Sequence, residues 1–243
     1  MLLTVIALFF SAIAAGMIQS VTGFGAAVLL MLILPLFFNM AVSAGVSSSI
    51  CLGLTGIMAW RYRKHIQWKL VLLPAICYLM TSTIAIKYSK GINTSTLSAL
   101  FGGFLLLLGS YSFFFAQRFS IRANVFSATV CGLVGGICSG LFSTGGPVIA
   151  LYYLPASEKK ENYLANIQFL FLLSNIMNLY TRCTNGLYTA DLVPYTLIGF
   201  GGVLLGKQCG VHFVDSIDTS LMKKLVYSFI AISGLLLVLK RFL

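Results

Sequence analysis

The sequence predicts an all-α polytopic membrane protein made of two homologous halves, and three observations support this fold class. Hydrophobic residues make up 59% of the 243 residues and charged residues only 9%, whereas soluble domains carry roughly 25% charged residues. No Asp, Glu, Lys or Arg occurs before Arg61, although one membrane-spanning helix needs only about 20 apolar residues. Several sequence landmarks also recur about 120 residues apart.

The charge balance favours a membrane partner over a nucleic acid. Sixteen Lys and Arg residues against five Asp and Glu give a formal net charge of +11. The basic residues are scattered among apolar runs and form no patch that a phosphate backbone would contact. The predicted partner is the lipid bilayer, and the composition excludes a soluble enzyme and a disordered chain.

Charged and turn-forming residues divide the chain into apolar runs, each of which we expect to form a helix or part of one. Hydropathy alone indicates about seven or eight spanning helices, and more if the first segment of each half forms a full hairpin. The runs of the first half are 2–18, 24–38, 41–60, 70–87 and 96–117. Those of the second half are 123–138, 146–155, 162–181, 190–207 and 221–239.

Two uncharged stretches are too long for a single crossing. One straight helix over residues 1–38 would span nearly 60 Å, about twice the thickness of the hydrocarbon core. The residues best able to turn this stretch are 19–25, and the matching residues of the stretch 123–156 are 139–147. We therefore predict that the first helical segment of each half is broken or re-entrant at these residues.

The two breaks belong to an internal duplication, which predicts one integral membrane domain with a first repeat over 1–117 and a second over 118–243. The loop 61–69 holds four Lys or Arg and no acid, so the positive-inside rule places it in the cytoplasm. Its counterpart, 182–191, holds one basic and one acidic residue, which favours halves inserted in opposite directions, an inverted repeat. The matching landmarks are Gly16 with Gly136, Pro35 with Pro155, Pro74 with Pro194, and Lys87 with Lys207.

Both breaks are predicted to bind a solute. Irregular backbone at membrane depth persists where it lines a polar cavity or is buried in protein. The helix after each break would direct free N–H groups and its positive dipole end at the break, which favours an anion. No Asp or Glu precedes Glu158 to bind a cation. The alternative, that these Gly-rich segments only pack against neighbouring helices, stays open. The candidate substrate-binding residues are Gln19, Ser20, Thr22, Gly23, Phe24, Gly25, Ser139, Gly140, Ser143, Thr144, Gly145, Gly146, Asn166 and Gln168.

No pattern indicates catalysis, a metal ion or a cofactor. The sequence contains no HExxH motif, no paired carboxylates within an apolar run and no nucleotide-binding loop. Its six cysteines show no CxxC spacing. The energy for any transport would therefore come from an ion or solute gradient, or from a separate subunit.

Two motifs resemble the signatures of a known family. They are GMIQSVTGFG at residues 16–25 and GICSGLFSTGGP at residues 136–147. Together with the length and the two halves of the whole chain, they resemble the sulfite exporter TauE/SafE family of membrane transporters, also called the toluene sulfonate uptake permease family. The first motif departs from the family's common form, because it has Thr22-Gly23-Phe24-Gly25 where many members have a run of glycines.

This resemblance implies a multi-pass carrier in the inner cell membrane for small sulfur-containing or organic anions such as sulfite or sulfonates. Transport in either direction would be driven by a coupling ion, a proton or sodium, or by the solute's own gradient. We expect a secondary transporter, with a passive anion channel and a non-transporting membrane assembly subunit as the alternatives. A homo-oligomer is compatible with the sequence.

Overall fold

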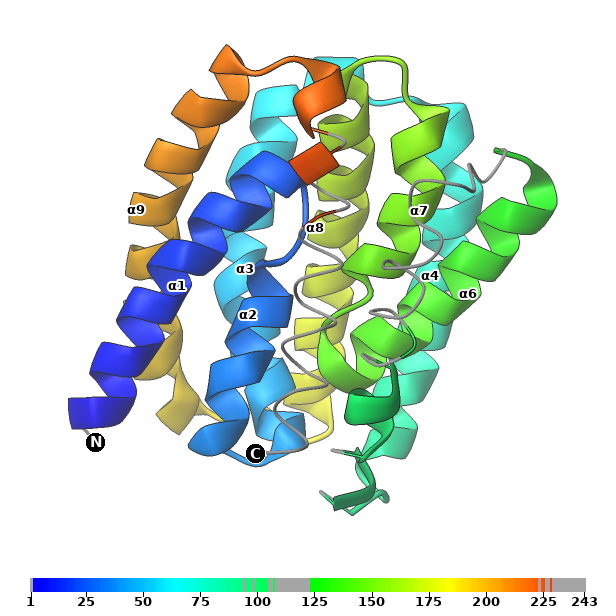
Figure 1. The fold of residues 1–243 in the computed structure, drawn as a ribbon. Coiled ribbons are helices and arrows are strands. Elements are labelled where there is room, and N and C mark those ends of the chain that lie inside the picture. Colours follow the sequence, from blue (N-terminus) through cyan, green and yellow to red (C-terminus); the bar gives the residue numbers. More distant parts are fainter. Residues whose placement is uncertain are drawn as a thin grey trace.

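The computed structural model describes residues 2–93, 95–97, 99–104, 107, 123–222, 224–225 and 228, and every regular element in this part of the chain is helical (Figure 1). The helices of the first half are α1 (Leu2–Thr22), α2 (Ala26–Ile33), α3 (Met40–Tyr62) and α4 (Trp68–Ser89). Those of the second half are α6 (Val125–Phe142), α7 (Gly146–Ala156), α8 (Lys160–Thr184) and α9 (Val193–Ser216). Short 3-10 turns occupy Leu34–Leu36, Arg63–His65 and Ala190–Leu192.

Five of the described helices, α1, α3, α4, α6 and α9, are long and apolar enough to cross a membrane. The apolar helices α2 and α7 are shorter, and α8 is too polar to belong to this group. The chain is therefore a multi-pass membrane protein. The predicted runs 96–117 and 221–239 and the predicted boundary between the repeats lie mostly outside the described residues, so the expected helix count stays a prediction.

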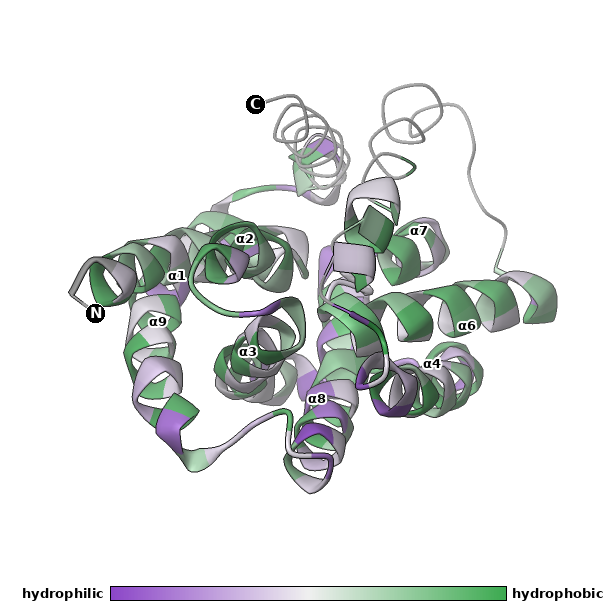
Figure 2. Ribbon diagram, turned by 90° about the horizontal axis from the view of Figure 1, so that it is seen from below, coloured by the Kyte–Doolittle hydropathy of each residue, from purple (hydrophilic) through white to green (hydrophobic). Residues whose placement is uncertain are grey.

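Apolar side chains face outward and polar ones are concentrated inside the bundle. On α4, the exposed residues Leu72, Ile76, Met80 and Ile84 recur at every fourth position, which places them on one lipid-facing stripe. Hydrophilic residues are visible along α8 in the middle of the bundle (Figure 2). This distribution is expected where lipid surrounds the bundle and polar groups satisfy one another inside it.

Glycines bring the outer helices close to their neighbours. A methyl group on Gly206 of α9 would strike the Ile13 backbone of α1, and one on Gly136 of α6 would strike the Tyr78 backbone of α4. Such close approach is typical of packed membrane helices. Along α1 and α9, and along α4 and α6, contacting residues advance together, so each pair is parallel. The central helices α3 and α8 are antiparallel, because the start of α3 contacts the end of α8.

Helix ends lie within both predicted break segments. Helix α1 ends at Thr22 and α2 begins at Ala26, while α6 ends at Phe142 and α7 begins at Gly146. The first residue after α1 is Gly23 with a φ of 82°, and the first after α6 is Ser143 with a φ of 58°. Left-handed backbone stops an α-helix, and Ser143 is the one described non-glycine residue that adopts it.

Candidate functional site

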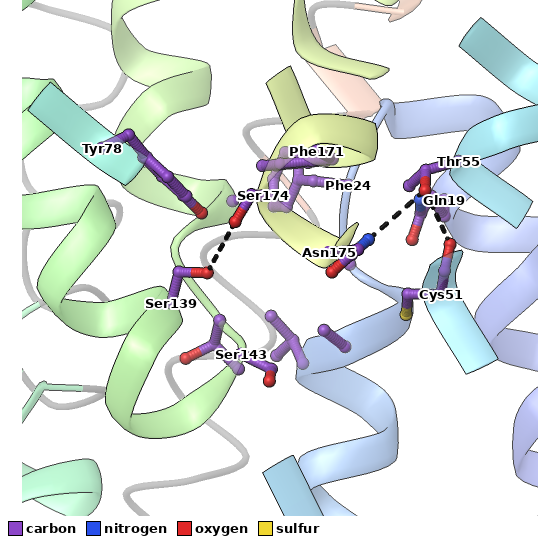
Figure 3. Close-up of a pocket in the computed structure, with 15 residues that line it drawn as sticks. Gln19, Phe24, Cys51, Thr55, Tyr78, Ser139, Ser143, Phe171, Ser174 and Asn175 are labelled. Carbon is purple, nitrogen blue, oxygen red and sulfur yellow. Dashed lines mark hydrogen bonds between the residues drawn. The ribbon is translucent and has the colours of Figure 1, made fainter. Parts of the chain in front are cut away.

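A small cavity lies between the two connections α1–α2 and α6–α7 (Figure 3). Its volume is about 30 Å³, and one buried water needs roughly 10–15 Å³ on this scale. The cavity therefore has room for about two water molecules. The predicted site residues that line it are Gln19, Phe24, Gly25, Ser139, Ser143, Thr144 and Gly146.

The two connections touch each other at this cavity. Phe24 from the first connection packs against Gly146 at the start of α7, where an added methyl group would lie 2.8 Å from the Phe24 Cβ atom. Only glycine permits this approach, because such a contact is far inside van der Waals distance. Segments about 120 residues apart in sequence thus meet at one cavity.

The first connection is held by α8. The Gln168 side chain donates a 2.9 Å hydrogen bond to the Gly23 carbonyl oxygen and accepts a 3.3 Å hydrogen bond from Gln19. The Tyr163 hydroxyl donates to the Thr22 carbonyl oxygen at 2.7 Å. These bonds satisfy carbonyl groups that the end of α1 leaves without helical partners. Gln168 and Gly23 therefore support the cavity wall without lining it.

The second connection is held by α3. The Ser143 hydroxyl group lies 2.6 Å from that of Ser48 and donates to the Ala44 carbonyl oxygen at 2.7 Å. Gly145 lies directly against the Tyr78 hydroxyl, leaving no space for a side chain. In both connections, the residue with left-handed backbone after the helix is thus hydrogen-bonded to a central helix of the other half. Gly23 is bonded to α8, and Ser143 is bonded to α3.

The Thr144 hydroxyl and the first turn of α2 bring hydrogen-bond donors to the cavity wall. The Thr144 hydroxyl is buried and has no hydrogen-bond partner among the described residues. Ala27 and Val28 line the cavity from the first turn of α2, where backbone N–H groups have no partner within the helix. Pro147 removes one such donor from α7. No acidic residue lines the cavity, so its chemistry suits an oxyanion.

Several lining residues were not among the sequence candidates. Ser174 and Asn175 come from the polar part of α8: Ser174 lies 3.4 Å from the Ser139 hydroxyl, and Asn175 donates to Thr55 at 3.3 Å. Their polarity within a membrane helix is a signal that sequence analysis can detect. Tyr78 gives no such signal, because aromatic residues are common in packed helices. The additional lining side chains are Cys51, Thr55, Tyr78, Phe171, Ser174 and Asn175.

Four further candidates lie outside the cavity wall. Asn166 is fully buried but accepts a hydrogen bond from the Gln67 backbone and donates to its side chain, at the start of α4. Ser20 and Thr22 donate back to carbonyl groups of α1. The Gly140 carbonyl accepts a hydrogen bond from Arg182, a buried residue that the sequence analysis did not select. Among the described residues, no group of His, Cys, Asp and Glu is arranged to hold a metal ion.

A family comparison decides the class of protein. The family model described as sulfite exporter TauE/SafE matches residues 8–237. The chain belongs to the sulfite exporter TauE/SafE family. Members of this family are membrane transporters and not enzymes, and the family points to sulfur-containing anions as the transported class. Neither a curated protein nor a solved structure matches the chain.

Proposed function

We propose that this TauE/SafE protein is a secondary transporter that binds a small sulfur oxyanion, such as sulfite, between the connections α1–α2 and α6–α7. The observation that carries this proposal is the buried, unpartnered Thr144 hydroxyl in the wall of the cavity at the first turn of α2. A buried donor without a partner costs about 1–3 kcal/mol, and an anion would supply the missing acceptor.

The size of the cavity supports a compact substrate. A volume of about 30 Å³, which is room for about two water molecules, favours a compact oxyanion over a longer one. Longer organic sulfonates would need the surrounding helices to separate. We therefore rank sulfite above larger sulfonates as the substrate.

An inverted repeat supplies the means of alternating access in this proposal. The most extensive helix contacts have counterparts when α1–α4 are exchanged with α6–α9: α1 packs on α9 as α6 packs on α4, and α3 packs on α9 as α8 packs on α4. The antiparallel arrangement of α3 and α8, which correspond to each other, supports opposite insertion of the halves. Rocking of one repeat against the other would expose a site between them to each side in turn.

Hydrogen bonds around the two connections support the same correspondence. The residues Gln168 and Ser48 occupy matching positions on α8 and α3, and they bond the matching residues Gly23 and Ser143. With the basic segment Arg61–His65 in the cytoplasm, the N-terminal end of α3 would face the outside of the inner cell membrane.

Flux measurements test the proposal. The full chain in liposomes should take up sulfite with saturation, and sulfite trapped inside should accelerate uptake by counterflow. A secondary transporter requires both results. Conductance far above carrier turnover and no counterflow would instead identify a passive channel, and absence of any sulfite flux would contradict the proposal.

A further inference from the structure

Arg182 is a buried cation near the end of α8. Its side chain is fully shielded from solvent. Nη2 donates a 2.6 Å hydrogen bond to the Gly140 carbonyl oxygen of α6, and Nη1 donates at 3.2 Å to the Ala41 carbonyl oxygen of α3. Nε has no partner among the described residues. Because a guanidinium has five N–H donors, these bonds leave it with spare donor capacity.

No carboxylate balances this charge. The sequence has five acidic residues, all in the described part of the chain, and the ion pair found there joins Arg61 to Asp215. A buried charge without a counter-ion is costly, and ionisable residues within membrane helices are rare and concentrated on transport pathways. Carbonyl oxygens solvate the Arg182 guanidinium but do not neutralise it.

Contacts along two helices, α3 and α8, each lead from the Arg182 guanidinium to a residue of the cavity wall. On α3, it bonds the Ala41 carbonyl, whereas Ser143, which lines the cavity, bonds the carbonyl of Ala44. These two carbonyls are three residues apart, or roughly 4.5 Å along the helix. On α8, Arg182 follows Asn178 by four residues, and Asn178 donates to Ser139 in the cavity wall.

Ser174, Asn178 and Arg182 therefore form a polar row on one face of α8, because residues four apart share a helix face. The row begins at the cavity with Ser174, and all three side chains reach α6 through Ser139 or Gly140. A small oxyanion in the cavity would lie about two helical turns from a fixed positive charge, in surroundings of low dielectric constant.

We infer that Arg182 supplies the positive charge that makes this site select anions, through the polar row that joins it to the cavity. This inference rests on the proposed function, because it concerns the same site. The oxygen atoms of Ser139, Ser174 and Asn178 would otherwise suit a small cation. Arg182, one turn from Asn178, disfavours a cation there by charge repulsion.

Matched variants test the inference on the purified full chain. Arg182→Lys keeps the charge, and Arg182→Gln removes it while retaining an N–H donor. Lys160→Gln is the control, because the Lys160 ammonium donates to the carbonyl oxygens of Val214 and Ile217 at the end of α9, outside the cavity wall. The measurement is the sulfite dissociation constant, obtained from sulfite-dependent thermal stabilisation.

We expect sulfite to bind the Lys variant within about fivefold of the unaltered protein and the Gln variant at least about tenfold more weakly. The Lys160 variant should melt earlier without sulfite yet keep its affinity. If Arg182 only held the end of α6 in place, its variants would change the melting temperature and leave sulfite affinity unchanged. Equal affinity in the Gln variant and the unaltered protein, or equal losses in the Lys and Gln variants, would overturn the inference.

A comparison on the unaltered protein covers the case in which the Arg182 variants do not fold. Dimethyl sulfoxide has the pyramidal shape of sulfite but no charge. Sulfite should stabilise the protein and dimethyl sulfoxide should not, and equal stabilisation at equal concentration would overturn the inference. Absence of sulfite binding to the unaltered protein contradicts the proposed function itself, which separates the two failures.

Discussion

Asn175 on α8 donates a 3.3 Å hydrogen bond to the hydroxyl of Thr55 on α3, and the two residues stand 120 positions apart in the chain. Both line the cavity. Under the proposed duplication, this offset makes them matching residues of the two repeats. If the halves form the proposed inverted repeat, a bond between matching residues would place its two-fold axis at this point of the α3–α8 contact.

Exchanging these two residues tests the proposed symmetry. Thr55→Asn alone crowds the cavity with two amides, and Asn175→Thr alone leaves a gap, so each single variant should lose about 1 kcal/mol of stability and most of the sulfite flux. The double variant should recover both properties, because matching surroundings accept either arrangement. A double-mutant cycle of melting temperature and flux measures the coupling; additive losses would contradict the symmetry.

Removal of the Thr144 hydroxyl should have opposite effects on protein stability and on sulfite affinity. Thr144→Val keeps the shape of the side chain and removes the unpartnered buried hydroxyl, so the protein without ligand should become more stable by about 1 kcal/mol. Sulfite affinity should fall about tenfold, because the hydroxyl no longer donates to the anion. Thermal melting with and without sulfite measures both quantities.

Ser157 provides the matched control for Thr144. Its hydroxyl is also buried without a partner, and it follows α7 away from the cavity wall. Ser157→Ala should therefore stabilise the protein in a similar way and leave sulfite affinity unchanged. Loss of affinity in both variants, or in neither, would argue against a direct role of Thr144.

The ends of α1 and α6 fall in segments whose local composition shows a backbone constraint, whereas a broken or re-entrant path through the membrane stays a prediction. An uncharged stretch longer than the bilayer has to turn, and the helix ends at Thr22 and Phe142 lie in the Gly- and Ser-rich segments that permit a turn. The left-handed residues Gly23 and Ser143 are also 120 positions apart, the offset of the proposed duplication. The composition around each helix end depends on residues close together in the chain, and the offset depends only on comparing two such segments.

The composition of the cavity wall could be predicted only in part, because it depends on which helices meet. Asn166 and Asn175 are both amides on α8, yet one faces Gln67 and the other the cavity. Helical spacing gives their relative direction but not the identity of the neighbouring helix. Arg182 was missed for a related reason: it is close to a helix end in sequence, where basic residues usually reach the membrane surface, but in the fold α3 and α6 enclose it.

Asn166 and Gln168 form a matched pair that separates folding from binding. Both are fully buried on α8, and each takes part in two side-chain hydrogen bonds, Asn166 with Gln67 and Gln168 with Gln19 and Gly23. Alanine at either position should lower stability by about 1–3 kcal/mol, since partners are left unsatisfied. Only Gln168→Ala should weaken sulfite binding, by about tenfold, because only Gln168 holds a cavity segment in place.

Melting curves and sulfite titrations of the two alanine variants provide the measurement. Equal sulfite affinities in the two variants would show that the connection α1–α2 does not shape the site. A large loss of affinity in Asn166→Ala would place the start of α4 within it.

The contact between Phe24 and Gly146 predicts the effect of a single methyl group. Gly146→Ala would bring the new Cβ atom to 2.8 Å from the Phe24 Cβ atom, which is fixed to the backbone and cannot rotate away. The two connections should be forced apart, and sulfite flux should fall at least about tenfold, since a displacement near 1 Å at a binding site has effects of this order.

Gly56→Ala on α3 is the control, because its methyl group would meet Leu172 at an ordinary 3.8 Å. Flux into liposomes, normalised to the amount of folded protein, should be unchanged in the Gly56 variant; unchanged flux in the Gly146 variant would mean that the contact between the two connections is not needed for transport.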